Sequence, residues 1–464
     1  MRIFPRPLEI GDTEGFTGEK DIFGRQELGS SLTSLVGLVV DPMVIAIDGQ
    51  WGTGKTTFLK MWAGQLRQQG FPVIYFDAFE NDYVDDAFAA LASEIIGLVE
   101  AEKKANEPKA REFKAKAVGA LKVLGRSAIK VGVKAASMGT LDATELSDDI
   151  VEAISDEAEE LTDKHIGELL TKQAEHRSIL QGFRDALRDL PGILAPAPEP
   201  KEGKEAAKAK PLIFMIDELD RCKPLFALAL LERIKHFFAV PNVHFALGTH
   251  MGQLRNSVNA AYGANINANT YLQKFISLTF PLTDHGSHQY DRTATKYIAH
   301  LQKEMDIASD DQNFTEHSVR FAQTYALIHD CSLRDVEHFM TNIALAAAFT
   351  TKHTLRPAPL IAGLSILRVV QPELYARAKL KKLTYEEVEK AFSLEHKGDG
   401  DSELGYTQWE RHWWEYCLNK EISEEMARNF SNGLFNYYIS DRFSIIPLIA
   451  HKVVDNLVPS QKNQ

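Results

Sequence analysis

Cysteine is scarce in this sequence of 464 residues, which contains only Cys222, Cys331 and Cys417. These residues lie far apart and form no C-x-x-C pair, so the sequence predicts neither a disulfide framework nor a zinc ribbon. Long apolar runs are also missing, because no stretch approaches the roughly 18 uncharged apolar residues that a membrane-spanning helix needs. Residues 1–7 lack the apolar core of a signal peptide. We therefore expect a cytoplasmic protein without a transmembrane segment.

An excess of basic residues is missing as well, since 64 acidic residues outnumber 52 lysines and arginines and the formal net charge is −12. The chain as a whole is therefore not expected to attract nucleic acid, although a local basic patch is compatible with this total. A hydrophobic fraction of 44% and a charged fraction of 25% are those of an ordinary folded protein. The length suffices for about two or three domains.

The strongest motif is the segment 49–56, Gly-Gln-Trp-Gly-Thr-Gly-Lys-Thr, which matches the phosphate-binding pattern G-x-x-x-x-G-K-[ST]. An apolar run over 43–47 precedes it and predicts a buried strand, and residues 57–62 predict the first turns of a helix. Glycines allow such a loop to direct its backbone N–H groups at a phosphate, and the helix N-terminus adds partial positive charge. The motif therefore predicts a nucleotide-binding loop in its required context of strand, loop and helix.

The residues of this loop have distinct expected roles. Lys55 is expected to reach the β- and γ-phosphates, and Thr56 to place its hydroxyl on Mg²⁺. The other residues expected to contact the nucleotide are Gly49, Gln50, Trp51, Gly52, Thr53, Gly54 and Thr57. ATP and Mg²⁺ are therefore the predicted cofactors.

A second motif is the apolar run over 211–216 that ends in Asp217 and Glu218, the pattern of a Walker B strand. Asp217 is expected to hold Mg²⁺, usually through water, because the phosphates alone leave octahedral positions open. Glu218 is placed to orient and polarise the attacking water. Together with Lys55 and Thr56, this pair predicts hydrolysis of ATP in addition to binding.

Further strands are predicted over 73–79, 243–250 and 278–280, with helices between them. Together with the two motif strands they make an α/β fold with a doubly wound, mainly parallel sheet of about five strands, whose ligand belongs at the carboxyl ends of the strands. We predict a nucleotide domain in two parts, 1–98 and 211–285, separated by a helical insertion over 99–210 and followed by a helical lid or sensor domain over 286–394 and an aromatic-rich helical region over 395–464.

The predicted insertion is unevenly charged, being basic over 103–134 and acidic over 142–160, and the composition of residues 195–210 predicts a disordered linker. Its basic residues recur every four positions and would form one stripe on a helix, made of Lys122, Arg126, Lys130 and Lys134. One interpretation is a helical hairpin whose basic arm packs near the acidic arm. The alternative is an amphipathic helix that lies on nucleic acid or on the anionic inner face of a membrane.

Other positions are candidates for sensing a bound phosphate. Thr249 or His250, at the end of a predicted strand, could contact the γ-phosphate. Arg334, at the start of a predicted helix, could face the phosphates as a second sensor, or it could be a solvated arginine.

Several segments resemble the KAP family of P-loop NTPases. The most specific is Ile-Asp-Glu-Leu-Asp-Arg-Cys-Lys-Pro over 216–224, and the segments 76–79, 231–235, 241–243, 271–274 and 333–335 are also similar. The resemblance covers about residues 20–90 and 211–345 and implies an ATP-hydrolysing domain with a helical C-terminal extension. Family members commonly carry transmembrane helices between the two motifs, but here the insertion is charged. Some bacterial members are linked to phage exclusion, so antiviral defence with partner proteins or self-assembly is the expectation by analogy.

The sequence departs from the family pattern at three places. Phe79 stands where relatives tend to have Trp after the second strand, which is a mild change. His250-Met251 stands where relatives tend to have Asp-Arg, which leaves the first sensor open, and His338 replaces a basic residue in the helix of Arg334. Arg221 matches the pattern, and it could act in trans as an arginine finger or form a structural ion pair. The alternative to an ATPase is a nucleotide-gated scaffold that does not hydrolyse ATP.

Overall fold

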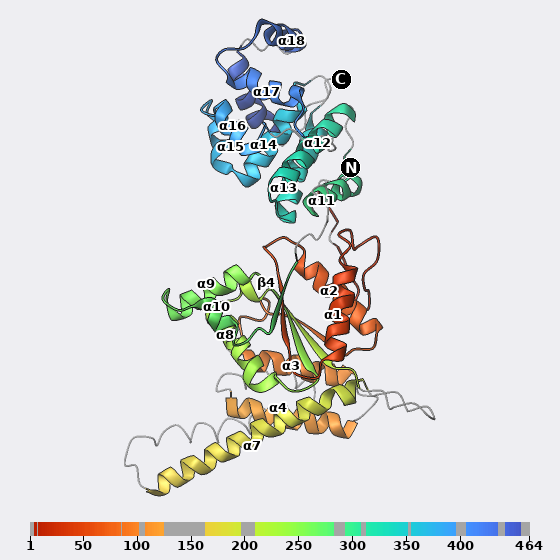
Figure 1. Ribbon diagram of the computed structural model, residues 1–464, viewed down its shortest axis with the longest axis vertical. Helices are drawn as coiled ribbons and strands as arrows, with labels where there is room; N and C mark the ends of the chain where they lie inside the picture. The colour runs from red at the N-terminus through yellow and green to blue at the C-terminus, as the bar shows by residue number, and fades with distance from the viewer. Residues whose placement is uncertain are drawn as a thin grey trace. The chain divides into compact units, whose positions relative to one another are not determined.

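The computed structural model describes residues 4–6, 8–84, 86–101, 107–124, 163–195, 209–282, 293–307, 312–350, 354–395, 405–434 and 441–455. Contacts between residues divide the chain into two compact units. The sheet unit comprises residues 10–49 and 55–282, and the helical unit comprises residues 1–9, 50–54 and 283–464. Figure 1 shows the elements of each unit.

The sheet unit is built on five parallel strands in the order β2-β3-β4-β1-β5. These strands are β1 (Val44–Asp48), β2 (Val73–Asp77), β3 (Leu212–Asp217), β4 (Val243–Thr249) and β5 (Leu278–Pro281). Asp48 is paired in register with Thr249, and Asp77 with Asp217. The predicted parallel α/β sheet is confirmed, and the polar ends of neighbouring strands meet at its carboxyl edge.

Helices cover both faces of the sheet (Figure 1). On one face, α1 (Gln26–Leu38) and α2 (Lys55–Gln68) bury Leu32, Phe58 and Trp62 against the strands. The other face is covered by α3 (Ala87–Ala101), α8 (Pro224–Arg233), the π-helical turn η3 (Ile234–Phe238), α9 (Met251–Tyr262) and α10 (Ala268–Leu272). Coverage on both faces explains why β3 and β4 are buried along their whole length and consist mainly of apolar residues.

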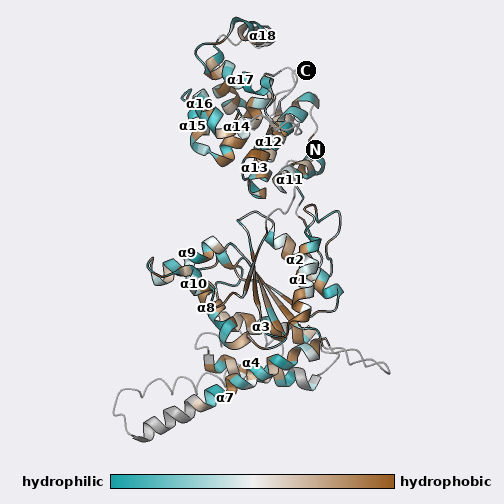
Figure 2. Cartoon of the chain, in the orientation of Figure 1, coloured by the Kyte–Doolittle hydropathy of each residue, from teal (hydrophilic) through white to brown (hydrophobic). Residues whose placement is uncertain are grey.

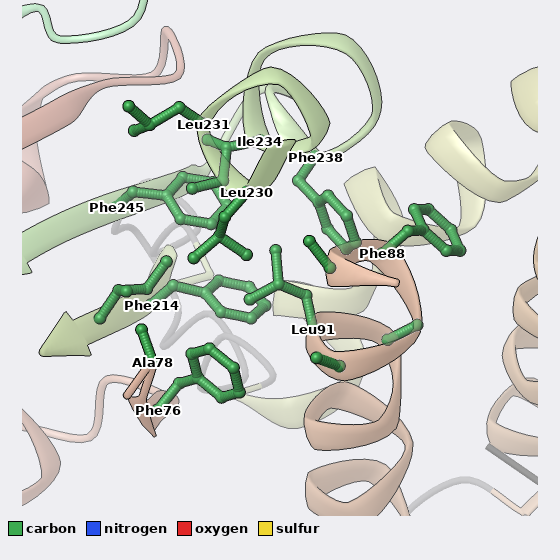
Figure 3. Close-up of a cluster of buried hydrophobic side chains, with 14 of the residues drawn as sticks. Phe76, Ala78, Phe88, Leu91, Phe214, Leu230, Leu231, Ile234, Phe238 and Phe245 are labelled. Atoms are coloured by element: carbon green, nitrogen blue, oxygen red, sulfur yellow. The ribbon is translucent and has the colours of Figure 1, made fainter. Parts of the chain in front are cut away.

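The core on this second face is aromatic (Figure 3). Phe214 of β3 stacks on Phe245 of β4 with ring centroids 4.9 Å apart, and Phe88 of α3 lies 5.2 Å from Phe238. Figure 2 shows the same pattern as apolar colour concentrated on the strands and on the inner sides of the helices. Burial of these rings fixes the strands, and hence the positions of the residues at the strand ends.

Two helices of the predicted insertion share this core. They are α4 (Glu107–Leu124) and α7 (Asp163–Leu194). Phe183 of α7 lies 5.2 Å from Phe88 and 5.5 Å from Phe238, and Phe113 of α4 is buried beside Phe183. These described parts of the insertion are thus built onto the sheet unit.

Other parts of the insertion lie outside the described residues, namely Arg126, Lys130 and Lys134 of the basic stripe, the acidic stretch 142–160 and residues 196–208 of the predicted linker. Among the helices that the structure describes, none combines the length and the apolar character needed to cross a bilayer.

The helical unit confirms the predicted all-helical C-terminal region. Its elements are α11 (Thr293–Glu304), α12 (Gln312–Ile328), α13 (Leu333–Phe349), α14 (Ala358–Val370), α15 (Pro372–Lys379), α16 (Tyr385–Phe392), α17 (Gln408–Leu418), α18 (Glu424–Leu434), η5 (Arg442–Ser444), α19 (Ile445–Ile449) and η6 (Ala450–Val454). Of the aromatic residues crowded on α17, Trp414 and Tyr416 are buried in the core of this unit, whereas Trp409 is 42% exposed.

Candidate functional site

The loop between β1 and α2 takes its shape from glycine. Gly52 and Gly54 have φ angles of +75° and +82°, which favour glycine because it has no Cβ. The backbone N–H and the hydroxyl of Thr53 both donate to the carbonyl of Gln50, at 3.3 and 2.8 Å. Helix α2 begins at Lys55 directly after this turn. The motif therefore forms a glycine-shaped turn at the N-terminus of a helix, an arrangement suited to anions.

The ammonium group of Lys55 is folded back over the loop. Its Nζ donates to the carbonyl of Gly49 at 2.6 Å, and the residue is only 8% exposed. Burial lowers the pKa of Lys55, while the nearby carboxylates of Asp220 and Asp217 act in the opposite direction. Thr56 and Thr57 follow in the first turn of α2 and are half-buried, and Trp51 at the loop is 45% exposed. The lysine thus lies among the charges of the predicted Walker B segment.

Asp217 is the last residue of β3 and is 1% exposed. Its Oδ2 accepts a hydrogen bond of 2.7 Å from the hydroxyl of Tyr75 on β2, and its Oδ1 accepts one of 2.9 Å from the backbone N–H of Glu218. Burial, followed by the charge of Asp217, raises the pKa of Tyr75, so the phenol stays protonated as a donor. Both oxygens of Asp217 are therefore held in a fixed orientation.

Two further residues shape this site and were not predicted. A Cβ added to Gly248 of β4 would lie 2.5 Å from Oδ1 of Asp217 and 2.5 Å from Cδ1 of Leu59, so the carboxylate occupies space that only glycine leaves open. Asp48, the last residue of β1, accepts a hydrogen bond of 2.9 Å from the backbone N–H of Met251 and so connects β1 to the start of α9. No local sequence signal identifies either role, because both depend on which strands are neighbours.

Glu218 follows Asp217 in the left-handed region, with a φ angle of 57°. The short 3-10 helix η2 (Leu219–Arg221) comes next and places Nη1 of Arg221 at 2.6 Å from Oε1 of Glu218. Burial raises the pKa of Glu218, and the charge of Arg221 opposes this change. The ion pair that the sequence left open for Arg221 is thus present, whereas a role in trans stays a prediction.

The sensor candidates lie in different units. Thr249 ends β4 and is fully buried, and its hydroxyl has no hydrogen-bond partner among the residues that the structure describes. His250 occupies the position before the first turn of α9. Arg334 is the second residue of α13 in the helical unit, where Ser332 and Asp335 cap the helix. Contact of Thr249, His250 or Arg334 with a phosphate stays a prediction.

The oxygen ligands of this site suit Mg²⁺. Asp217 supplies a buried carboxylate and Thr56 a hydroxyl, both of the hard type that Mg²⁺ prefers. In the part of the chain that the structure describes, no cluster of three or more His, Cys, Asp or Glu residues could hold a metal ion by itself. A nucleotide-bound Mg²⁺ fits this arrangement because it takes only one or two protein ligands and completes its shell with phosphates and water.

One strand, β4, separates the phosphate-loop strand β1 from β3. The loop follows the carboxyl end of β1, Asp217 is the last residue of β3, and Glu218 comes directly after it. This topology and the glycine-shaped loop define a nucleotide-binding protein of the P-loop class. Within that class the chain belongs to the KAP family, because the model of the KAP family P-loop domain matches residues 31–170 and 201–349, more than half of the sequence.

A comparison with curated proteins finds no match. Among solved structures, the chain is similar to the ORC2 protein of Aeropyrum pernix in its ADPNP and ADP complexes, with 10% identity, coverage of 94% of this chain and 95% of that chain, and a TM-score of 0.36. It is also similar to AMPPCP-bound DnaA from Aquifex aeolicus, with 10% identity, coverage of 93% and 100%, and a TM-score of 0.27. Similarities this distant add nothing about activity.

Proposed function

We propose that the protein binds ATP together with Mg²⁺ and hydrolyses it, and that hydrolysis drives a conformational switch or an assembly. The observation that supports this most strongly is the acidic pair at the end of β3. Asp217 is buried and oriented by two hydrogen bonds, and Glu218 stands beside it with a carboxylate that reaches solvent, its side chain being 18% exposed. Asp217 is thus placed to hold a cation and Glu218 to orient a water molecule.

The protein groups have separate tasks in this reaction. The N-terminus of α2 and the loop between Gly49 and Thr56 bind the phosphates. Lys55 exchanges its bond to the Gly49 carbonyl for oxygens of the β- and γ-phosphates. Asp217 and Thr56 hold Mg²⁺, which when bound supplies charge neutralisation on those phosphates. Glu218 orients the attacking water and accepts its proton.

Further side chains are proposed to sense the γ-phosphate. Thr249 donates its buried hydroxyl toward the γ-phosphate, with His250 as the alternative sensor, and Arg334 reports on the same phosphate from the helical unit. The helical unit then serves as the lid or sensor domain, and the described part of the insertion, α4 and α7, offers a surface to partners. Membership of the KAP family motivates partner binding or self-assembly in a cytoplasmic antiviral defence system.

Hydrolysis can be tested by measuring nucleotide binding and phosphate release separately. Lys55→Ala should lose ATP binding, whereas Glu218→Gln should bind ATP and Mg²⁺ but release little phosphate, because the amide cannot accept a proton. Glu27→Gln on the exposed surface of α1 is the matched control. Competition by GTP tests the preference for adenine. Equal phosphate release by the wild type and Glu218→Gln would rule out the proposed role of Glu218.

The second candidate is a nucleotide-gated scaffold that binds ATP without hydrolysing it. The ion pair between Arg221 and Glu218 favours it, because a carboxylate held by a guanidinium is a weaker base. Docking of residues 103–134 to a membrane surface or to nucleic acid would suit such a scaffold. Tight ATP binding with no phosphate release at any protein concentration would select it over the ATPase.

A further inference from the structure

The contact between Arg221 and Glu218 is built into the local backbone. Glu218 is in the left-handed region, and the backbone N–H of Arg221 donates to the Glu218 carbonyl at 3.0 Å, which closes the 3-10 turn. This turn places the two side chains together, with Nη1 of Arg221 at 2.6 Å from Oε1 of Glu218. Within the described residues, Arg221 is the side chain that hydrogen-bonds this carboxylate. The pairing therefore follows from the turn and needs no further element to form.

The pairing engages an oxygen that the proposed function requires. Oε1 of Glu218 lies 2.6 Å from Nη1 of Arg221, and the Glu218 side chain is only 18% exposed. While this oxygen accepts from the guanidinium, it is directed at Arg221 and not at an attacking water. Glu218 must therefore exchange its contact with Arg221 for one with the water.

We propose that Arg221 is a positioning residue that restrains Glu218, and that their ion pair must open before Glu218 can orient the attacking water. This inference rests on the proposed function, in which Glu218 is the general base. The pair slows hydrolysis because the carboxylate oxygen that contacts the guanidinium cannot at the same time be directed at the attacking water. The side chain of Arg221 is 31% exposed, so water can solvate its guanidinium when the pair opens.

The test compares Arg221→Gln and Arg221→Lys in the full chain by steady-state ATP hydrolysis, with kcat and KM determined separately. We expect Arg221→Gln to raise kcat about two- to fivefold near pH 8 without a change in KM, since a partly exposed ion pair is worth at most about 1 kcal/mol. Arg221→Lys keeps a cation that can pair with Glu218 and should keep a kcat close to that of the wild type.

A fall in kcat for Arg221→Gln that is restored by mixing with Lys55→Ala chains would overturn the proposal, because the arginine would then act in trans. A kcat of Arg221→Gln equal to that of the wild type would also overturn it. These results differ from failure of the proposed function itself, in which Glu218→Gln hydrolyses ATP at the wild-type rate whatever residue stands at 221. Thermal unfolding of each variant shows whether a lower rate reflects loss of fold.

Discussion

The hydrogen bond from Tyr75 to Asp217 should be needed for the use of Mg²⁺, although Tyr75 is outside the recognised motifs. Tyr75→Phe removes only the hydroxyl that donates to Oδ2 of Asp217 at 2.7 Å. The ring can keep its place on β2, so the substitution isolates the hydrogen bond. Asp217 is 1% exposed, and water therefore cannot easily replace the lost donor.

The magnitude follows from the charge of the acceptor. A hydrogen bond to a charged group contributes about 1.5–3 kcal/mol, so the free energy of unfolding of the nucleotide-free protein should fall by about this amount. Groups that orient a metal ligand typically change metal affinity or activity by about 10- to 100-fold. We therefore expect Mg²⁺-dependent ATP binding to weaken by about tenfold or more, whereas binding without Mg²⁺ changes little.

The assay is a titration of ATP at several Mg²⁺ concentrations, together with chemical denaturation of the nucleotide-free protein. Tyr83→Phe is the matched control, because Tyr83 follows the same strand but is 71% exposed. If Tyr75→Phe destabilises the fold while the Mg²⁺ dependence of ATP binding stays that of the wild type, Asp217 does not need Tyr75 for orientation and the reasoning is wrong.

Two other substitutions probe the same edge of the sheet. Gly248→Ala should lower the free energy of unfolding by about 1–3 kcal/mol through overpacking and weaken Mg²⁺-ATP binding, because the new Cβ would meet Asp217 Oδ1 at 2.5 Å. The control is Gly97→Ala, in which the added Cβ meets no atom within 4 Å. Unchanged ATP binding by Gly248→Ala would contradict the crowding argument. Thr249→Val removes a buried hydroxyl without a partner among the described residues, so denaturation should show a nucleotide-free protein at least as stable as the wild type. ATP turnover should nevertheless fall about tenfold or more if the hydroxyl bonds the γ-phosphate. Turnover at the wild-type rate would exclude Thr249 as the sensor.

Much of the fold and the central motifs can be predicted from the sequence because their signals are local. The phosphate loop is a contiguous pattern between an apolar run and a helix start, and Asp217 and Glu218 end an apolar run of strand length. The ends of the strands differ from the prediction by a residue or two, as at β2, which ends at Asp77. Site residues that lie close together in the sequence can therefore be predicted before the fold is known.

The supporting residues could not be predicted because their roles depend on strand order. Tyr75 and Gly248 affect Asp217 only because β2 and β4 are the two neighbours of β3. Nothing in the sequence around Tyr75 or Gly248 indicates a contact with Asp217. The prediction of helices between the strands did not show that two of them, α9 and α10, lie between β4 and β5.

The charged composition of the insertion did not indicate that parts of it belong to the hydrophobic core. Residues 99–210 differ in composition from their surroundings and were predicted as an inserted module, yet Phe113 and Phe183 are fully or almost fully buried in the core beside β3 and β4. A few large apolar side chains on one side of each helix are enough for this packing. Long charged side chains on the other sides dominate the average composition.

The most direct test of the central claim is the identity of the nucleotide that stays bound after one turnover. Wild type and Glu218→Gln are each loaded with a limiting amount of labelled ATP and Mg²⁺, denatured after a fixed time, and analysed for ATP and ADP. Hydrolysis at Lys55, Asp217 and Glu218 predicts mainly ADP from the wild type and mainly ATP from Glu218→Gln. ATP recovered intact from both proteins, or ADP recovered equally from both, would contradict it.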